Sequence, residues 1–251
     1  MRTFGSLLVR GLIVGLFAGL LAGTFAYVTG EPHVDAAIAI EEAASGGHTH
    51  DHGDEHATPA AEEEEPLVSR DGQRAGLFLA TSLYGVALGG IFAVGFTLLR
   101  RKLRTANDGY AALGLAAAGF VGIVLVPFLK YPPNPPAVGD PETITKRTIT
   151  YLLTIVIGLL AVWAGVALSR WAARYGDIAR LGGFVAGLLV TVVAAYLILP
   201  RINEVPDTFP ATLLWQFRFA SLGTQATLWL LLGFGYAAAV ARRPSEQKVN
   251  A

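Results

Sequence analysis

Six blocks of apolar residues, each about as long as a membrane-spanning helix, constrain this chain more than any other feature. A helix needs roughly 20 consecutive apolar residues to cross the hydrocarbon core of a bilayer. Charged side chains make up 15% of the 251 residues, against about 25% in ordinary soluble domains. We therefore predict an all-α integral membrane protein, a bundle of about six transmembrane helices. The expected spans are about 7–28, 75–99, 110–129, 149–169, 181–199 and 221–241.

The first span follows a basic N-terminus and could also be taken for a secretory signal. Its apolar run is longer than the roughly 7–15 residues of a signal core, so we expect it to be retained. Residues 1–251 then form a single membrane domain, with the segment 30–74 as a large loop within it. The chain has no cysteine, which excludes disulfides and thiolate metal ligands.

The distribution of basic residues predicts the orientation of this bundle. Six spans place both termini on one side, together with loops 100–109 and 170–180, and these segments carry twelve of the 19 lysines and arginines. Short loops rich in Lys and Arg stay in the cytoplasm. We therefore expect a multi-pass protein of the cell (inner or plasma) membrane, with both termini cytoplasmic. Loops 29–74, 130–148 and 200–220 would then face outward, and each begins with prolines that end the preceding helix.

The outward loop 30–74 concentrates residues of the kind that bind metal ions. Four of the five histidines and several acids stand within 46–66. Imidazole nitrogen and carboxylate oxygen suit cobalt, nickel, zinc and Cu(II), and in a His-x-His pattern alternate side chains share one face of an extended chain. A flexible loop of this kind predicts a metal collector with little geometric selectivity. Its expected ligands are His48, His50, His52, His56, Asp51, Asp54 and Glu55.

The acidic run that follows, Glu62 to Glu65, has two interpretations. It could raise the local cation concentration at the membrane face, or it could be a solvated linker that stays extended because like charges repel. The sequence is compatible with both.

A second set of polar residues falls at the predicted outer rim or inside the spans. Arg218 either extends its charged end outward to water along its own apolar stem or pairs with Glu31, Glu204 or Asp207 at an outer mouth. Gln225 lies inside the last span, where its amide either lines a path or holds two helices together by a hydrogen bond. No Asp, Glu, Lys, Arg or His stands in the middle of any predicted span, although proton-coupled carriers usually need one.

Glycines recur at intervals of four residues within three of the spans. They form a ridge in the first span and shorter pairs in the second and fifth. Small residues at this spacing let helix backbones approach closely, so we predict tight helix packing, and a glycine-lined pore is the less common alternative. The residues concerned are Gly11, Gly15, Gly19, Gly23, Gly85, Gly89, Gly183 and Gly187.

Several short elements occur in a fixed order along nearly the whole chain. After a glycine-rich first span come two acids, a histidine loop, an Asp-Gly-x-Arg element, a Pro-Pro-x-x-Pro loop and a final polar-aromatic stretch. They are Glu41, Glu42, His48, His50, His52, Asp71, Gly72, Arg74, Pro132, Pro133, Pro136, Phe217, Arg218, Ser221, Leu222 and Trp229. In this order the sequence resembles the CbtA family of predicted cobalt transporter subunits. The resemblance implies a membrane protein that imports cobalt together with a small, histidine-bearing partner of one span.

These observations lead to a functional hypothesis with two rivals. We expect uptake of a divalent transition metal, with cobalt or nickel preferred and zinc possible, without covalent chemistry and without a tightly bound cofactor. The expected partners are membrane lipid and the single-span protein that the resemblance implies, with no nucleic acid. The first rival is a metal sensor or scaffold that binds the ion but does not move it. The second rival is an efflux or tolerance protein.

Overall fold

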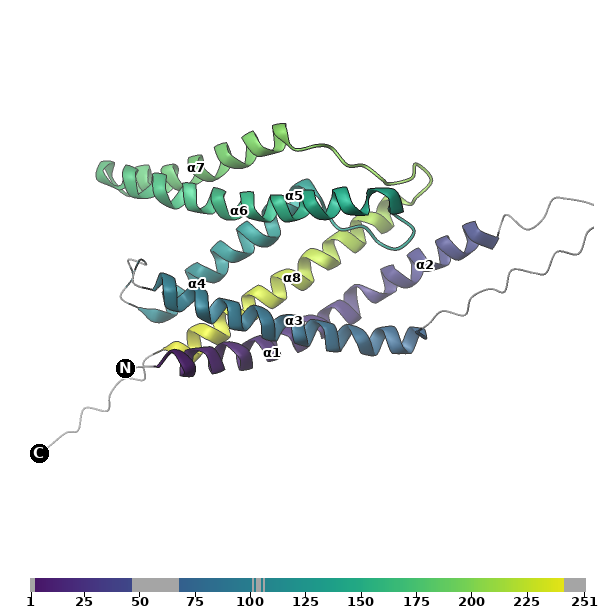
Figure 1. The fold of residues 1–251 in the computed structure, drawn as a ribbon, viewed down its shortest axis with the longest axis horizontal. Helices are drawn as coiled ribbons and strands as arrows, with labels where there is room; N and C mark the ends of the chain where they lie inside the picture. Colours follow the sequence, from purple (N-terminus) through teal and green to yellow (C-terminus); the bar gives the residue numbers. More distant parts are fainter. Residues whose placement is uncertain (1–2, 47–67, 101, 103–104, 106, 242–251) are drawn as a thin grey trace, which may run out of the picture.

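The computed structural model describes residues 3–46, 68–100, 102, 105 and 107–241. Within these residues all regular secondary structure is helical (Figure 1). The elements are α1 (Phe4–Thr29), α2 (Glu31–Gly46), α3 (Arg70–Leu99), α4 (Asp108–Gly119), η1 (Phe120–Leu125), α5 (Val126–Lys130), η2 (Pro141–Thr143), α6 (Ile144–Ala172), η3 (Ala173–Tyr175), α7 (Asp177–Ile198) and α8 (Ala211–Val240). The prediction of an all-helical fold is confirmed.

Five helical segments are long and apolar enough to cross a membrane: Phe4–Thr29, Arg70–Leu99, Asp108–Lys130, Pro141–Tyr175 and Asp177–Ile198. They correspond to the first five spans predicted from the sequence. The sixth predicted span coincides with the second half of α8, which is a 30-residue helix but is not one of these five segments. That α8 also crosses the membrane therefore stays a prediction.

The predicted metal-binding residues lie outside the part of the chain that the structure describes. They are His48, His50, His52, His56, Asp51, Asp54 and Glu55, and all belong to the segment 47–67 between α2 and α3. The loop that contains them is shorter than expected at its N-terminal side, because residues 31–46 form α2. The sequence VDAAIAIEEAA supplies the physical reason, since Ala, Ile and Glu are compatible with a helix and no interior Gly or Pro interrupts it.

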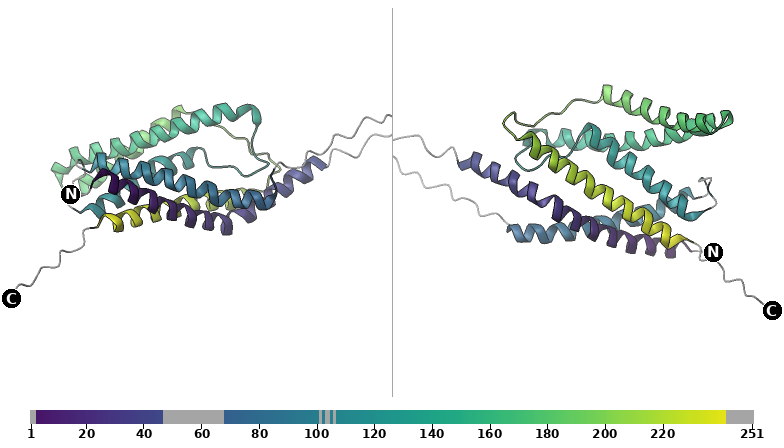
Figure 2. Two further views of the ribbon diagram at one scale, coloured as in Figure 1. Left: turned by 60° about the horizontal axis from the view of Figure 1, so that its bottom comes forward. Right: turned by 180° about the vertical axis from the view of Figure 1, so that it is seen from behind.

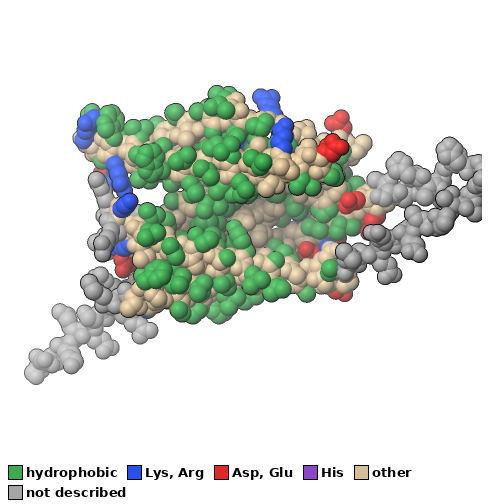
Figure 3. Space-filling model, viewed as in Figure 1, with side chains coloured by type: hydrophobic (Ala, Val, Ile, Leu, Met, Phe, Trp, Pro, Cys, Tyr) green, Lys and Arg blue, Asp and Glu red, His purple; other side chains and the backbone are tan. Residues whose placement is uncertain are grey.

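Successive long helices run in opposite directions, so the connections gather at two ends of the bundle (Figures 1 and 2). The start of α1 meets the end of α8, where the Arg10 Nη1 group donates to the Ala239 carbonyl at 2.5 Å. The connection between α3 and α4 and the turn between α6 and α7 lie at this same end. The side of the membrane that each end faces stays a prediction. Acidic side chains gather at the opposite end (Figure 3).

The glycine ridge of α1 packs directly against α3. A Cβ atom at Gly15 would overlap the carbonyl of Gly85, and one at Gly11 would overlap the carbonyl of Gly89. The two backbones are therefore in direct contact, which only residues without side chains permit. The prediction that these glycines serve helix packing is confirmed for α1 and α3.

The helices form two groups with separate cores. α1, α3, α4 and α8 share the larger core, which is centred on the fully buried Leu232 and Tyr236. A smaller core joins α5, α6 and α7 through Val126, Ala161 and Val192. α6 and α7 lie side by side, apart from α1 and α3, in all views (Figures 1 and 2). This division leaves space between the two groups.

The third predicted span, expected as one continuous helix, is interrupted in the structure. Between α4 and α5 the segment η1 is a π-helix, in which the Val126 N–H bonds to the Val121 carbonyl. Pro127 follows directly and has no N–H to continue the regular hydrogen-bond ladder. A π-helical turn widens the helix locally, and two of its residues, Ile123 and Val124, line the space between the two helix groups.

Candidate functional site

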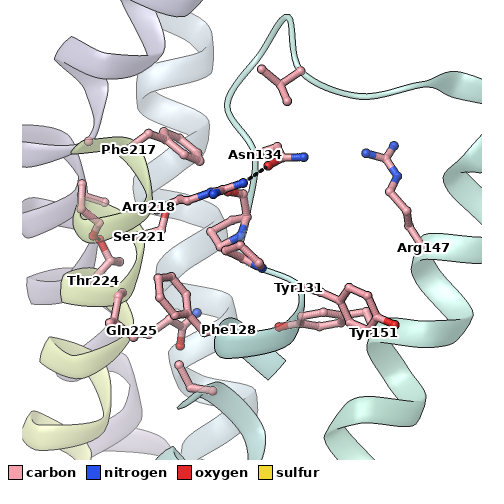
Figure 4. Close-up of a pocket in the computed structure, with 18 of the residues that line it drawn as sticks. Phe128, Tyr131, Asn134, Arg147, Tyr151, Phe217, Arg218, Ser221, Thr224 and Gln225 are labelled. Carbon is pink, nitrogen blue, oxygen red and sulfur yellow. Dashed lines mark hydrogen bonds between the residues drawn. The ribbon is translucent and has the colours of Figure 1, made fainter. Parts of the chain in front are cut away.

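A cavity of about 1210 Å³ lies between the two helix groups, at the end of the bundle where α2 and α6 begin. α8 and α3 form one wall, and the loop after α5 and the first half of α6 form the opposite wall (Figure 4). The space-filling view shows the hollow on the flank of the molecule, between α6 and α3 (Figure 3). The cavity is therefore bordered by elements from both helix groups.

One face of α8 supplies a polar stripe along the cavity. Arg218, Ser221, Leu222 and Gln225 follow the i, i+3, i+4, i+7 spacing of a single helix face, and all four line the cavity. Seven residues of α-helix correspond to a rise of about 10 Å, so Gln225 lies roughly two turns deeper than Arg218. The stripe begins at the loop level and continues towards the centre of the bundle (Figure 4).

Arg218 is held by the proline-rich loop rather than by an acid. Its Nη2 donates to Asn134 Oδ1 at 2.9 Å, and its Nε donates to the Pro133 carbonyl at 3.3 Å. The guanidinium also lies 5.3 Å from the ring centroid of Trp215. Of the two alternatives given for Arg218, the ion pair with Glu31, Glu204 or Asp207 is not formed among the described residues. Prolines fix the backbone of this loop and so hold its oxygen acceptors next to Arg218. This contact could not be predicted from the sequence.

Glu204 lies against the opposite wall of the cavity and has its own arginine. Its carboxylate accepts from Arg147 Nη1 at 2.8 Å, from the Asp140 backbone N–H at 3.3 Å and from the Thr143 hydroxyl. The Glu204 side chain is only 7% exposed. A buried carboxylate needs such compensation, and these contacts tie the loop after α7 to the start of α6.

Glu31 belongs to a cluster of charged residues that joins α2 to α3. Arg70 contacts Glu31 at 2.8 Å and Asp35 at 2.5 Å, and Arg74 contacts Asp35 at 3.0 Å and Glu31 at 3.6 Å. Asp71 adds a further contact to Arg74 at 3.5 Å. The Arg70 guanidinium, hydrogen-bonded to Asp35, holds the pKa of that carboxyl below its usual value. Arg70, together with Arg74 of the Asp-Gly-x-Arg element, thus anchors α2 at the edge of the cavity.

Gln225 is a polar side chain of the stripe with one buried atom left unpaired by the residues that the structure describes. Its Oε1 is buried and has no hydrogen-bond partner among the described residues. The same side chain interacts with the Tyr84 side chain of α3, which also lines the cavity. By contrast, the hydroxyl groups of Thr24, Thr81, Ser82, Thr154 and Thr191 donate to carbonyls of their own helices. Gln225 thus retains an acceptor for a further group.

The structure brings together four of the five residues predicted for the outer mouth or path. Glu31, Glu204, Arg218 and Gln225 line the same cavity, whereas the exposed Asp207 does not. Sequence reasoning did not single out several other lining residues, namely Tyr131, Asn134, Arg147 and Tyr151. The Pro-Pro-Asn-Pro-Pro run was the available signal for Asn134, because a polar residue between prolines is held in a fixed position. The aromatic and basic residues at the start of α6 carried no distinguishing pattern.

The described residues contain no group of three or more His, Cys, Asp or Glu side chains placed to hold a metal ion. Both carboxylates that line the cavity are engaged by arginines. The described walls therefore offer oxygen and N–H groups for a polar ligand, but no assembled metal centre.

Five helical segments are long and apolar enough to cross a membrane, and a cavity with polar side chains lies between the helix groups. These features are those of a helical membrane protein. The family model described as "Probable cobalt transporter subunit (CbtA)" matches residues 4–241, nearly the whole chain, and the chain belongs to this family. Comparisons with curated proteins and with solved structures give no match. Because the family description speaks of one subunit of a transporter, it implies at least one further protein in the assembly.

Proposed function

We propose that this protein takes up a divalent transition metal, cobalt or nickel in preference, through the cavity between its two helix groups. One structural observation supports this beyond the family membership. The segment that carries His48, His50, His52 and His56 connects α2 to α3, and both helices contribute to the cavity wall through Val34 and Leu77. The proposed metal collector thus connects two helices that both contribute to the cavity wall.

In this proposal the histidines, with Asp51, Asp54 and Glu55, collect the ion outside the membrane. The charged residues Glu31, Glu204 and Arg218 shape the mouth, and Gln225 contacts the path below it. Asp207 lies near the mouth on the loop before α8 without lining the cavity. The cytoplasmic placement of both termini follows from the excess of Lys and Arg in the termini and in the two short loops on the same side.

The test is the cobalt and nickel content of cells, measured by mass spectrometry at low external metal. Cells without the protein are compared with cells that contain the wild type or a variant with His48, His50, His52 and His56 all replaced by alanine. His33→Ala, which changes the fifth histidine on α2, is the matched control. We expect raised cobalt with the wild type and the control, and baseline cobalt with the fourfold variant.

Two other results would change the assignment. Equal metal content in all strains, with the protein shown to be in the membrane together with its partner, excludes uptake and favours a sensor or scaffold. Lower metal content in cells with the wild type than in cells without it excludes import and indicates efflux.

A further inference from the structure

The charge of Arg218 is the starting point, because no acid in the described part of the chain balances it. An arginine has five N–H donors, and two of them bond to Asn134 Oδ1 and to the Pro133 carbonyl. Both acceptors are neutral. The remaining donors belong to a side chain that lines the cavity, as Figure 4 shows. The cavity therefore contains a positive charge with hydrogen-bonding capacity left over.

The acids of the cavity wall do not offset this charge, because each is already paired. Glu204 binds Arg147 and is nearly inaccessible, and Glu31 binds Arg70 and Arg74. A bare dication next to Arg218 would meet like-charge repulsion, which is stronger where water is largely excluded. It would also find no group of three His, Cys, Asp or Glu ligands among the described residues to replace its water shell.

The size of the cavity and its other polar groups fit a larger, anionic ligand. Its volume of about 1210 Å³ exceeds the roughly 300–1,000 Å³ of typical small-molecule pockets. Guanidinium groups bind carboxylates through two parallel hydrogen bonds. Deeper in the cavity, Gln225 Oε1 lacks a donor, and water bound to a metal ion is a hydrogen-bond donor. Aromatic rings of Phe128, Tyr131 and Tyr151 complete the walls (Figure 4).

We propose that the cavity binds an organic carboxylate on Arg218, and that cobalt passes this stage as a carboxylate complex rather than as the aqua ion. A carboxylate of the complex occupies the free donors of Arg218, and metal-bound water faces the amide oxygen of Gln225. Only the statement that cobalt passes as a carboxylate complex rests on the proposed uptake function. The carboxylate site itself follows from the cavity and does not depend on transport.

Equilibrium dialysis of the purified full chain in detergent tests the proposal without a transport assay. The probes are labelled citrate, malate and tartrate, each with and without Co²⁺, and Co²⁺ alone. We expect at least one carboxylate to bind the wild type, to bind more tightly with cobalt, and to lose about tenfold or more in affinity in Arg218→Gln, the scale of a charged hydrogen bond. Arg201→Gln, an exposed arginine outside the cavity, should behave as the wild type.

Each alternative result is decisive for one part of the proposal. If none of the three carboxylates binds the wild type, or if Arg218→Gln binds them as the wild type does, the carboxylate site is excluded. If a carboxylate binds equally well with and without cobalt, the site stands and the complex is excluded. Should Arg218→Gln fail to fold, Arg218→Lys decides, because it keeps the charge but loses two-point binding, and unchanged affinity in it overturns the site.

The proposed uptake function can fail separately from this site. Binding of Co²⁺ alone should depend on the four loop histidines and should be unaffected by Arg218→Gln. The fourfold histidine variant should retain carboxylate binding. A protein that binds the carboxylate complex but leaves cellular cobalt unchanged would keep the site and lose the uptake function.

Discussion

Gly15 of α1 and Gly85 of α3 face each other so closely that a Cβ atom on either would meet the carbonyl oxygen of the other. Replacing Gly85 by Ala should therefore force the helices apart. We expect the free energy of unfolding to fall by about 1–3 kcal/mol, the usual cost of overpacking. Thermal unfolding in detergent measures the effect.

The control for this substitution lies on the same helix. Gly95 has no atom within 4 Å of the position that a Cβ would take, so Gly95→Ala should be neutral or stabilise α3 by roughly 0.5–1 kcal/mol through its higher helix propensity. Equal destabilisation by both variants would contradict the packing role of Gly85.

The ion pair between Arg147 and Glu204 gives a second prediction. Arg147→Gln leaves the nearly buried Glu204 carboxylate without its charge partner. Breaking a fully buried pair from one side costs about 3–5 kcal/mol, and the cost here should be smaller because the Arg147 side chain is 34% exposed. The variant should still unfold at a lower temperature. The double variant Arg147→Gln, Glu204→Gln should recover much of this loss, because no unpaired charge remains. A double variant as unstable as the sum of the two single variants would show that the residues act independently.

The sequence was sufficient to predict features that depend on local periodicity. Apolar blocks predicted the long helices, and the spacing of Gly11, Gly15, Gly85 and Gly89 predicted which helix faces pack closely, although the structure was needed to show that α1 and α3 are the pair. The same reasoning grouped the connections at two ends, because consecutive spans must alternate in direction. None of these inferences requires knowledge of which distant residues meet.

The cavity could be predicted only in part, because it depends on contacts between distant residues. Glu31, Glu204, Arg218 and Gln225 were identified as polar residues near or inside the spans, but their partners were not. Arg218 bonds to a loop 84 and 85 residues away, and the position of that loop depends on its prolines and on the π-helical turn before it. The charge of Arg218 suggested an acid as its partner, whereas in the structure its partners are neutral oxygen atoms.

Acid should weaken the attachment of α2 to α3 through Asp35. Its folded-state pKa lies below the usual 3.8, mainly because of the hydrogen bond from Arg70. A depressed pKa means that the stabilisation is fully present above the unfolded-state value and is lost as the pH falls through the folded-state value. The wild type should therefore be more stable than Asp35→Asn at neutral pH, and the two should converge below about pH 3.8. Thermal unfolding of both proteins as a function of pH measures this, and a difference that persists unchanged in acid would exclude an ionic role.

Metal binding by the histidine loop should weaken at a higher pH than the attachment of α2 through Asp35. Neutral imidazole is the ligand form, and its ordinary pKa is about 6.5. Binding of Co²⁺ to the purified protein, followed by calorimetry, should decline as the pH is lowered from about 7.5 to 5.5. The variant with His48, His50, His52 and His56 replaced by alanine should show little binding over the whole range. Binding that persists in this variant would place the metal on other residues.

Gln225 separates a role in the path from a role in holding helices together. If its amide served helix association, Gln225→Leu would lower stability, by roughly 0.6 kcal/mol for a typical hydrogen bond between membrane helices. In the structure its buried Oε1 has no partner among the described residues, and an unsatisfied buried acceptor costs free energy. Removing the amide should therefore offset the loss of its contact with Tyr84 of α3. We therefore expect Gln225→Leu to unfold at the same or a higher temperature than the wild type while cellular cobalt falls towards the level of cells without the protein.

Leu222→Met, a change of similar volume on the same face of α8 that leaves the amide in place, is the control and should keep wild-type uptake. Lower stability with unchanged cobalt content in Gln225→Leu would assign the residue to helix packing instead.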